Sequence, residues 1–210
     1  GWNKTIGALR ARVWFPDLRG RVRKYIANCP TCCFNKVKPH VGKMHIPANG
    51  NQPWQVLQVD IVHLHLTESG REKAVVFYDR FTRDVEAFAV AGDVDSVTIL
   101  NLIIYEIVQR HGWPRVLYSD RGSNLISTLC EEFYVSFGID LRAADAHMHT
   151  AVAGCERFNA TLRELARATH FDTNYQWDAV LPLLVYYYKS LIQSATGYSP
   201  FYLNHGREAV

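Results

Sequence analysis

Residues 56–62 read Val-Leu-Gln-Val-Asp-Ile-Val, an apolar run that alternates like a β-strand and carries one carboxylate, Asp60. A second short strand, predicted at residues 115–118, leads almost directly to Asp120, and Glu156 opens a stretch with the pattern of the first turns of a helix. Carboxylates at two strand ends and a helix start can converge on one point. They can then hold two divalent cations about 3.5–4 Å apart, which clamp the attacking and leaving oxygens of a phosphoryl transfer.

Each of the three acids has a simpler explanation when it is taken alone. An Asp after a strand is commonly a turn or helix-capping residue, and a Glu in a first helical turn is favoured by the helix dipole. Their combination at this spacing favours a metal site over three separate structural roles. Two magnesium ions, or manganese in their place, fit best because magnesium takes few carboxylates and keeps positions for water and phosphate oxygens.

The composition is typical of one medium domain with a small appendage. The 210 residues are 48% hydrophobic and 12% aromatic, which supports a real core. No apolar run approaches the roughly 20 residues that cross a bilayer, and no signal peptide opens the chain, so we expect a soluble protein with no membrane partner. The cysteine count of five is odd, and Cys29, Cys32 and Cys33 crowd together, which favours a reducing compartment over a disulfide framework.

The net charge of +3 hides an asymmetry along the chain. Residues 1–43 hold ten Lys and Arg against one acid, Asp17, a net +9, whereas residues 44–210 hold thirteen against nineteen acids, a net −6. A basic arm beside an acidic core is expected if the arm engages phosphates and the core gathers metals. A solvated basic helix face explains the charge equally well.

Hydrophobic periodicity and turn signals predict an α/β fold that follows a small helical segment. Residues 1–36 read as two helices interrupted at Pro16, and residues 37–53 as a linker rich in Pro and Gly. The predicted core has three strands, then helices that alternate with two more strands. The predicted ranges are strands 54–63, 72–79, 84–90, 115–118 and 139–142, and helices 95–111, 126–136, 154–169 and 175–192.

Four segments resemble the integrases of retroelements, most closely those of gypsy-type LTR retrotransposons. They are Trp54 to Asp60, Tyr118 to Asn124, Glu156-Arg157-Phe158-Asn159, and Thr196 to Phe201 with the following His205 to Glu208. The segments occur in the family's order and span nearly the whole chain.

The resemblance implies an RNase H-like integrase catalytic core at residues 54–207, a five-stranded mixed sheet flanked by helices. A truncated N-terminal zinc-binding segment of the HHCC type at 1–36 and a linker at 37–53 precede it. In that fold the first and fourth strands lie side by side, which brings Asp60 near Asp120.

The implied activity is that of a DDE-type polynucleotidyl transferase and endonuclease. Water attacks a phosphodiester near the end of the element's DNA, and the freed 3′-hydroxyl then attacks a target phosphodiester. The resemblance makes Asp60, Asp120 and Glu156 the magnesium ligands. It also implies double-stranded DNA as partner, both element ends and target, a homo-oligomer, synthesis within a polyprotein, and action in the nucleus.

Residues near these ligands carry weaker predictions. Ser123 and Asn124 are expected to contact DNA or shape the loop after the strand, and a simple turn explains them equally well. Arg157 can meet phosphate or an acidic partner, and Asn159 can brace the adjacent loop. For these last two we favour structural roles.

Cys29-Pro30-Thr31-Cys32 is half of a zinc site, because two thiolates at this spacing reach one tetrahedral ion. Two incidental thiols explain the pair as well when it is taken alone. In the resembling family two histidines lie well upstream of such cysteines, but all nine histidines here lie downstream of Cys32. We therefore expect the chain to start after those histidines, so that the zinc site is incomplete. Cys33, Cys130 and Cys155 are predicted to be small buried hydrophobes.

One segment departs from the family. Residues 147–155 replace a loop that usually contains Pro and Asn-Gly, and Gly154 is expected to supply some of the lost backbone freedom. Two histidines in this segment, His147 and His149, can contact DNA or simply be exposed. The altered loop keeps an alternative function open, a catalytically inactive integrase-derived module that binds DNA or protein. A third possibility, a nuclease of the RNase H-like fold that is not an integrase, is disfavoured by the basic arm.

Overall fold

A computed structural model describes residues 2–29, 49–119, 128–143, 149–173 and 176–209. The chain divides into two compact units, one of residues 1–43 with 187–210 and one of residues 44–186. Within the described residues, no helix is both long enough and apolar enough to span a bilayer.

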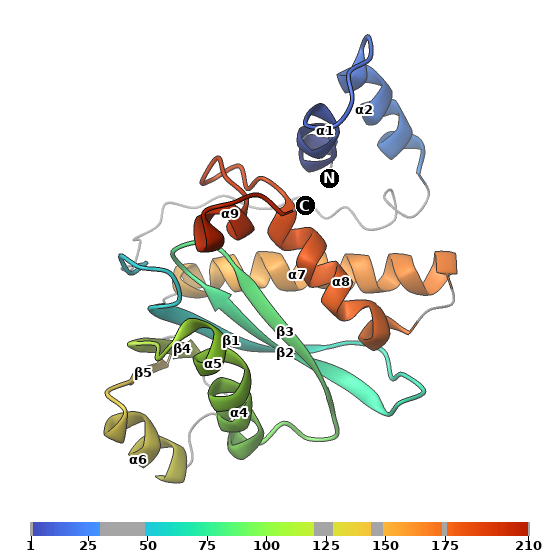
Figure 1. Ribbon diagram of the computed structural model, residues 1–210. Helices are drawn as coiled ribbons and strands as arrows, with labels where there is room; N and C mark the ends of the chain where they lie inside the picture. Colours follow the sequence, from blue (N-terminus) through green and yellow to red (C-terminus); the bar gives the residue numbers. More distant parts are fainter. Residues whose placement is uncertain (1, 30–48, 120–127, 144–148, 174–175, 210) are drawn as a thin grey trace. The chain divides into compact units, whose positions relative to one another are not determined.

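The larger unit is built on a five-stranded mixed sheet with the strand order β3-β2-β1-β4-β5 (Figure 1). Strands β1, β2 and β3 pair antiparallel, whereas β1, β4 and β5 pair parallel. All five predicted strands are confirmed to within two residues at each end. Their bounds are β1 Val56–His63, β2 Arg71–Asp79, β3 Val85–Ala91, β4 Val116–Ser119 and β5 Asp140–Ala143.

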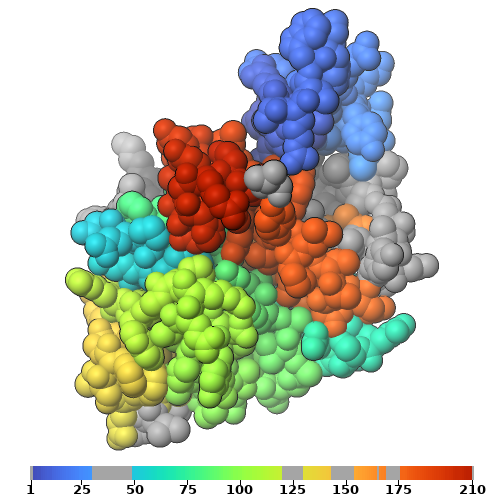
Figure 2. Space-filling view, viewed as in Figure 1, coloured from blue at the N-terminus to red at the C-terminus, as the bar shows by residue number. Residues whose placement is uncertain are grey.

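The main hydrophobic core lies on the sheet face that carries Leu57 and Val59 of β1. Ile99, Ile103 and Ile107 pack against this face and are fully buried. They come from a helical span made of α4 Ser96–Leu102, the π-helical η1 Ile103–Val108 and α5 Gln109–His111. Helix α6, Thr128–Ser136, lies beside α4 on the same face (Figure 2).

The helix predicted at 95–111 is confirmed, with a π-helical turn that the sequence did not indicate. Its start is fixed by Asp95, whose carboxylate accepts hydrogen bonds from the backbone N–H of Thr98 at 2.8 Å and from its hydroxyl at 2.6 Å. Its end is set by Gly112, which has the positive φ of 83° that only glycine adopts readily.

Helix α7, His149–Thr173, covers the opposite face of the sheet. The prediction of a helix at 154–169 that starts close to Glu156 was wrong at its N-terminal end, because the helix begins seven residues before Glu156. Ala151-Val152-Ala153 contains the strongest helix former and no proline, so nothing in this segment stops a helix. Helix α8, Trp177–Ser190, follows and matches the helix predicted at 175–192.

The smaller unit contains α1 Trp2–Arg10 and α2 Leu18–Asn28, which confirms the two predicted N-terminal helices. Asp17 caps α2 by accepting a hydrogen bond from the backbone N–H of Gly20 at 3.1 Å. A small core of Ile6, Leu18, Val22 and Ile26 joins the two helices. The unit also contains α9, Pro200–His205, a short helix that the sequence analysis did not predict.

Candidate active site

Asp60 lies in the middle of β1, on the face of the sheet that α7 covers. Its Oδ1 accepts a hydrogen bond from the backbone N–H of Ile61 at 2.8 Å, and its Oδ2 accepts one from Nδ2 of Asn159 at 2.5 Å. An ionised carboxylate only accepts hydrogen bonds, so the amide nitrogen of Asn159 must face it. This contact ties α7 to β1 beside the first predicted metal ligand.

Glu156 lies three residues before Asn159 and therefore on the same side of α7. Asn159 is only 2% exposed, whereas Glu156 is exposed and can receive a ligand. The buried thiol of Cys155 lies close to both carboxylates: burial raises its pKa, and the charges of Asp60 and Glu156 raise it further. Asp60 on β1 and Glu156 on α7 thus both lie near Cys155.

The thiol of Cys155 also favours one orientation of the Asn159 amide. Its Sγ lies 4.0 Å from Oδ1 of Asn159, which makes the thiol a weak donor to the oxygen of that amide. The amide nitrogen is left for Asp60. Cys130 and Cys155 are both fully buried, as predicted, while Cys33 lies outside the described residues.

Gly154 lets α7 approach the sheet closely. A Cβ at this position would lie 2.7 Å from Cε1 of Tyr78 on β2 and 3.0 Å from its hydroxyl oxygen. Gly154 lies inside the helix and is not among the residues with positive φ. The expectation that it restores loop freedom was therefore wrong, since the glycine serves to make space for the tyrosine ring.

Asp120 lies outside the described residues, as do Ser123 and Asn124. The parallel pairing of β1 with β4 is described as far as Val59 with Ser119, each one residue before a predicted ligand. The expected neighbourhood of the first and fourth strands is confirmed, while the place of the second ligand stays a prediction.

The donor set fits a magnesium ion at Asp60 and Glu156. A carboxylate offers about four lone-pair positions, so the two hydrogen bonds just described are compatible with a cation at Asp60. Carboxylate oxygens are the ligands that magnesium prefers. Among the described residues, no three His, Cys, Asp or Glu side chains gather as a metal site, and the predicted third ligand is not one of these residues.

The remaining predicted site residues are only partly described. Cys29 follows α2 and is half-buried, while Cys32 lies outside the described residues, so the zinc half-site stays a prediction. Arg157 is exposed on α7. Burial raises the pKa of the nearby Tyr78 phenol, and the positive charge of Arg157 partly opposes that rise. His147 lies outside the described residues, and His149 is the first residue of α7.

The main role of Asn159 was not predicted. This residue was expected to brace the adjacent loop, whereas its side chain holds the carboxylate of Asp60. The signal was present in the spacing, because a residue three positions after Glu156 shares its helical face. The close approach of Tyr78 to Gly154 had no signal, since it depends on how β2 lies against α7.

Comparisons with known proteins identify this fold. The five-stranded mixed sheet with helices on both faces is the fold of RNase H-like integrase catalytic cores. Residues 50–149 match the family described as the integrase core domain, and residues 1–38 match the integrase zinc binding domain. The chain thus matches both an integrase core domain and an integrase zinc binding domain, and its relatives include retroviral and retrotransposon polyproteins.

Among the relatives, the Gag-Pol polyprotein of woolly monkey sarcoma virus is 26% identical over 83% of this chain, and the Tf2-3 transposon polyprotein of Schizosaccharomyces pombe is 23% identical over 94%. The chain spans only 10% and 15% of the lengths of these two relatives.

Two solved structures share the fold at 19% identity. A simian T-cell lymphotropic virus intasome in complex with the PP2A regulatory subunit B56 gamma matches 97% of this chain and 71% of its own, with a TM-score of 0.68. The catalytic core domain of HTLV-2 integrase in complex with magnesium, in a trimeric form, matches 74% of this chain and 99% of its own, with a TM-score of 0.60.

Proposed function

We propose that this chain is the integrase portion of a gypsy-type retrotransposon polyprotein and catalyses metal-dependent 3′-end processing and strand transfer. The observation that carries the proposal is the hydrogen bond from Asn159 to Asp60, because it sets the helix of Glu156 against the strand of Asp60. Asp120 is the third ligand in this proposal. It follows Ser119, whose strand pairs with that of Asp60.

The residues of the chain have separate tasks in this mechanism. Asp60, Asp120 and Glu156 would hold two magnesium ions, which would supply electrostatic stabilisation of the charge that develops in the phosphoryl transfer. Asn159 is a positioning residue that holds one oxygen of Asp60. Holding the ligands to within about 1 Å matters, because a displacement of that size can cost on the order of a hundredfold in rate.

The proposed substrates are the ends of the element's double-stranded DNA and a target duplex. The basic stretch at residues 1–43, with its net charge of +9, supports a role in phosphate binding. Cys29 and Cys32 are proposed to bind a zinc ion when histidines complete the site. We further propose a homo-oligomer that acts in the nucleus; the oligomer is supported by the intasome and the trimeric integrase core with which this chain shares its fold.

The test is a joining assay in which a duplex with a recessed 3′-hydroxyl end is incubated with a second, labelled duplex and magnesium or manganese. Asp60→Asn, Asp120→Asn and Glu156→Gln should each reduce joining by several orders of magnitude, because the metal's electrostatic stabilisation supplies most of the catalysis. DNA affinity should stay the same or rise, since each change removes one negative charge.

The matched control is Asp93→Asn, which removes an exposed carboxylate that pairs with Lys73 at 3.0 Å. This variant should join DNA like the parent protein. If the parent chain binds DNA but joins none with either metal, the inactive DNA- or protein-binding module replaces the integrase as the function.

A further inference from the structure

Strand β5 forms one edge of the sheet (Figure 1). Within the described part of the chain its only neighbouring strand is β4, with which it pairs in parallel. The backbone N–H of Asp140 donates a hydrogen bond to the oxygen of Arg115 at 2.8 Å, so this residue's backbone faces β4. The backbone groups of successive residues point to opposite sides of a strand. The N–H and the oxygen of Leu141 therefore face outward, where a further strand can pair with them.

The residues on either side of Leu141 carry opposite charges on one face of the sheet. Asp140 and Arg142 share that face because side chains alternate along a strand, and their side chains are 54% and 49% exposed. Nη2 and Nε of Arg142 both contact Oδ2 of Asp140, at 2.6 and 2.8 Å, and Oδ1 takes part in neither contact. Nη1 of Arg142 donates a hydrogen bond to the hydroxyl of Tyr118 at 3.1 Å, which holds the guanidinium close to the sheet.

The other face of this edge is apolar. A hollow of about 500 Å³ lies between β5 and α6, and its lining includes Val135, Ile139 and Leu141. Val135 is 78% exposed although its side chain is hydrophobic. The backbone N–H of Ile139 donates to the oxygen of Tyr134 at 2.8 Å, which fixes the end of α6 against the start of β5. The edge thus combines outward backbone groups, an apolar hollow and two opposite charges.

We propose that β5 pairs antiparallel with β5 of a second copy of this chain, about a two-fold axis at Leu141. The two Leu141 residues then form a hydrogen-bonded pair, in which each N–H donates to the oxygen of the other. Asp140 lies directly opposite Arg142 of the second copy, and Arg142 lies opposite its Asp140, in the more closely spaced pairs of an antiparallel ladder. The symmetry makes every contact twice.

A second copy fits this edge better than an unrelated strand does. A strand that carries one sign of charge attracts one of the two charged side chains and repels the other. The segment Asp140-Leu141-Arg142, by contrast, is complementary to itself when it runs in the opposite direction. Charges on an edge strand commonly discourage pairing, and this arrangement discourages it with any strand that lacks the matching charges. Both α6 helices lie on the same side of the joined sheet, so each can cover the exposed Val135 of the other.

This contact goes beyond the proposed function, because it specifies a surface for self-association that needs neither DNA nor metal. A contact of one short strand lies at the weak end of protein interfaces, so association is measured at protein concentrations up to about 1 mM. All measurements use the full chain in EDTA without DNA. Their outcome is therefore independent of the joining assay.

Sedimentation equilibrium compares the parent chain with two charge reversals. Arg142→Glu places a carboxylate opposite Asp140 of the second copy, and Asp140→Lys places an ammonium opposite its Arg142. Each change replaces two attractive pairs by two repulsive pairs, so the dissociation constant should rise by at least about tenfold. Melting temperatures should stay close to that of the parent, because ion pairs between exposed side chains contribute little to folding.

A mixture of the two variants separates pairing between chains from effects within one chain. The Arg142→Glu chain has two negative charges on this face and the Asp140→Lys chain has two positive charges, so a dimer of one of each has every ion pair restored. The mixture should associate about as tightly as the parent. Neither variant keeps the ion pair between residues 140 and 142 of its own chain, so recovery requires contact between chains.

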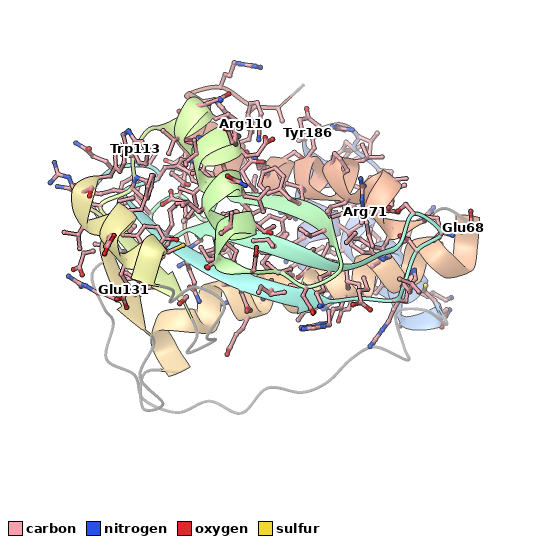
Figure 3. The ribbon with its side chains drawn as sticks, turned by 90° about the horizontal axis from the view of Figure 1, so that it is seen from below. Glu68, Arg71, Arg110, Trp113, Glu131 and Tyr186 are labelled. Carbon is pink, nitrogen blue, oxygen red and sulfur yellow. The ribbon has the colours of Figure 1, made fainter. Side chains whose placement is uncertain are left out.

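The matched control is Glu68→Lys, which reverses one exposed charge away from β5 and should associate like the parent. Figure 3 shows Glu68 at the opposite end of the sheet from Glu131, which belongs to α6 and also lines the hollow.

Hydrogen exchange locates the contact on the chain. The amide of Leu141 should exchange more slowly as the protein concentration rises, because pairing protects it, and Arg142→Glu should remove this dependence. The amide of Asp140 should change less, since it is already bonded to Arg115 within the chain. Equal association of the parent and both single variants, a mixture of variants that does not associate, or exchange at Leu141 that is independent of concentration would each overturn the inference.

Discussion

The substitution Gly154→Ala tests how closely α7 packs against Tyr78 of the sheet. In an ordinary helix interior this change stabilises by about 0.8–1.0 kcal/mol, because alanine is the better helix former. Here the added Cβ would lie 2.7 Å from Cε1 of Tyr78. Carbon atoms prefer separations of about 3.5–4.0 Å, so the ring or the helix must move by about 0.8 Å or more. Overpacking of this kind costs about 1–3 kcal/mol.

The gain in helix propensity and the steric cost oppose each other, and the steric cost is expected to be larger. Urea unfolding should show a net destabilisation of up to about 2 kcal/mol in Gly154→Ala. The rate of DNA joining should fall further than the loss of folded protein alone explains, because Glu156 lies two residues later on the same helix. The matched control is Gly7→Ala, a helical glycine with no atom within 4 Å of the added Cβ, which should slow hydrogen exchange in α1.

A double-mutant cycle with Tyr78→Val isolates the contact. Since Tyr78→Val removes the ring, adding Gly154→Ala should then cost nothing or stabilise the fold. The coupling energy between the two sites should therefore be about 1–3 kcal/mol, the steric cost that the ring imposes. If the single variant Gly154→Ala is instead stabilised by the full helix-propensity gain of about 0.8–1.0 kcal/mol, α7 does not approach Tyr78 closely.

Three further changes test separate parts of the structure. Asn159→Ala removes a buried hydrogen bond to a carboxylate, worth about 1.5–3 kcal/mol, and should reduce joining without reducing DNA affinity in a filter-binding assay; equal losses of both would contradict a positioning role. Deleting residues 1–43 should flatten the dependence of duplex affinity on salt, since each neutralised phosphate contributes about 0.9 to the logarithmic slope, and an unchanged slope would make the arm a solvated face. Burial raises the pKa of Cys155 in the folded chain, so the unfolded thiol ionises first. The stability it contributes is present below the unfolded pKa of about 8.5 and is lost as pH rises toward the folded value. Urea midpoints measured from pH 7 to 10 should fall less steeply in Cys155→Ala, and parallel profiles would show that this thiol does not titrate with folding.

Local signals explain why most of the core was predictable. The strand at 56–63 was predicted from its apolar alternation. The end of the helix at His111 was predicted from Gly112 and Pro114, because glycine and proline end a helix regardless of its tertiary contacts. The pairing of β1 with β4 was expected from the family resemblance and is confirmed.

The features that escaped prediction depend on tertiary contacts or on competing weak preferences. The start of α7 was placed too late, because the resemblance suggested a loop where alanines at 151 and 153 favour helix. The π-helical turn at Ile103–Val108 leaves no mark in the hydrophobic period that predicts a helix. Asn159 was recognised as a structural residue, but its partner, Asp60, is known only once α7 lies against β1.

If Asp60, Asp120 and Glu156 share divalent metal, the bound ions can be located by anomalous diffraction from a crystal soaked in manganese, with Glu156→Gln crystals soaked in parallel. We expect a manganese peak within about 2.0–2.5 Å of carboxylate oxygens of Asp60 and Glu156, with Asp120 as a further ligand, and a weakened or lost peak in the variant. Manganese bound elsewhere only, or not at all, in crystals where both carboxylates are well ordered would contradict this expectation.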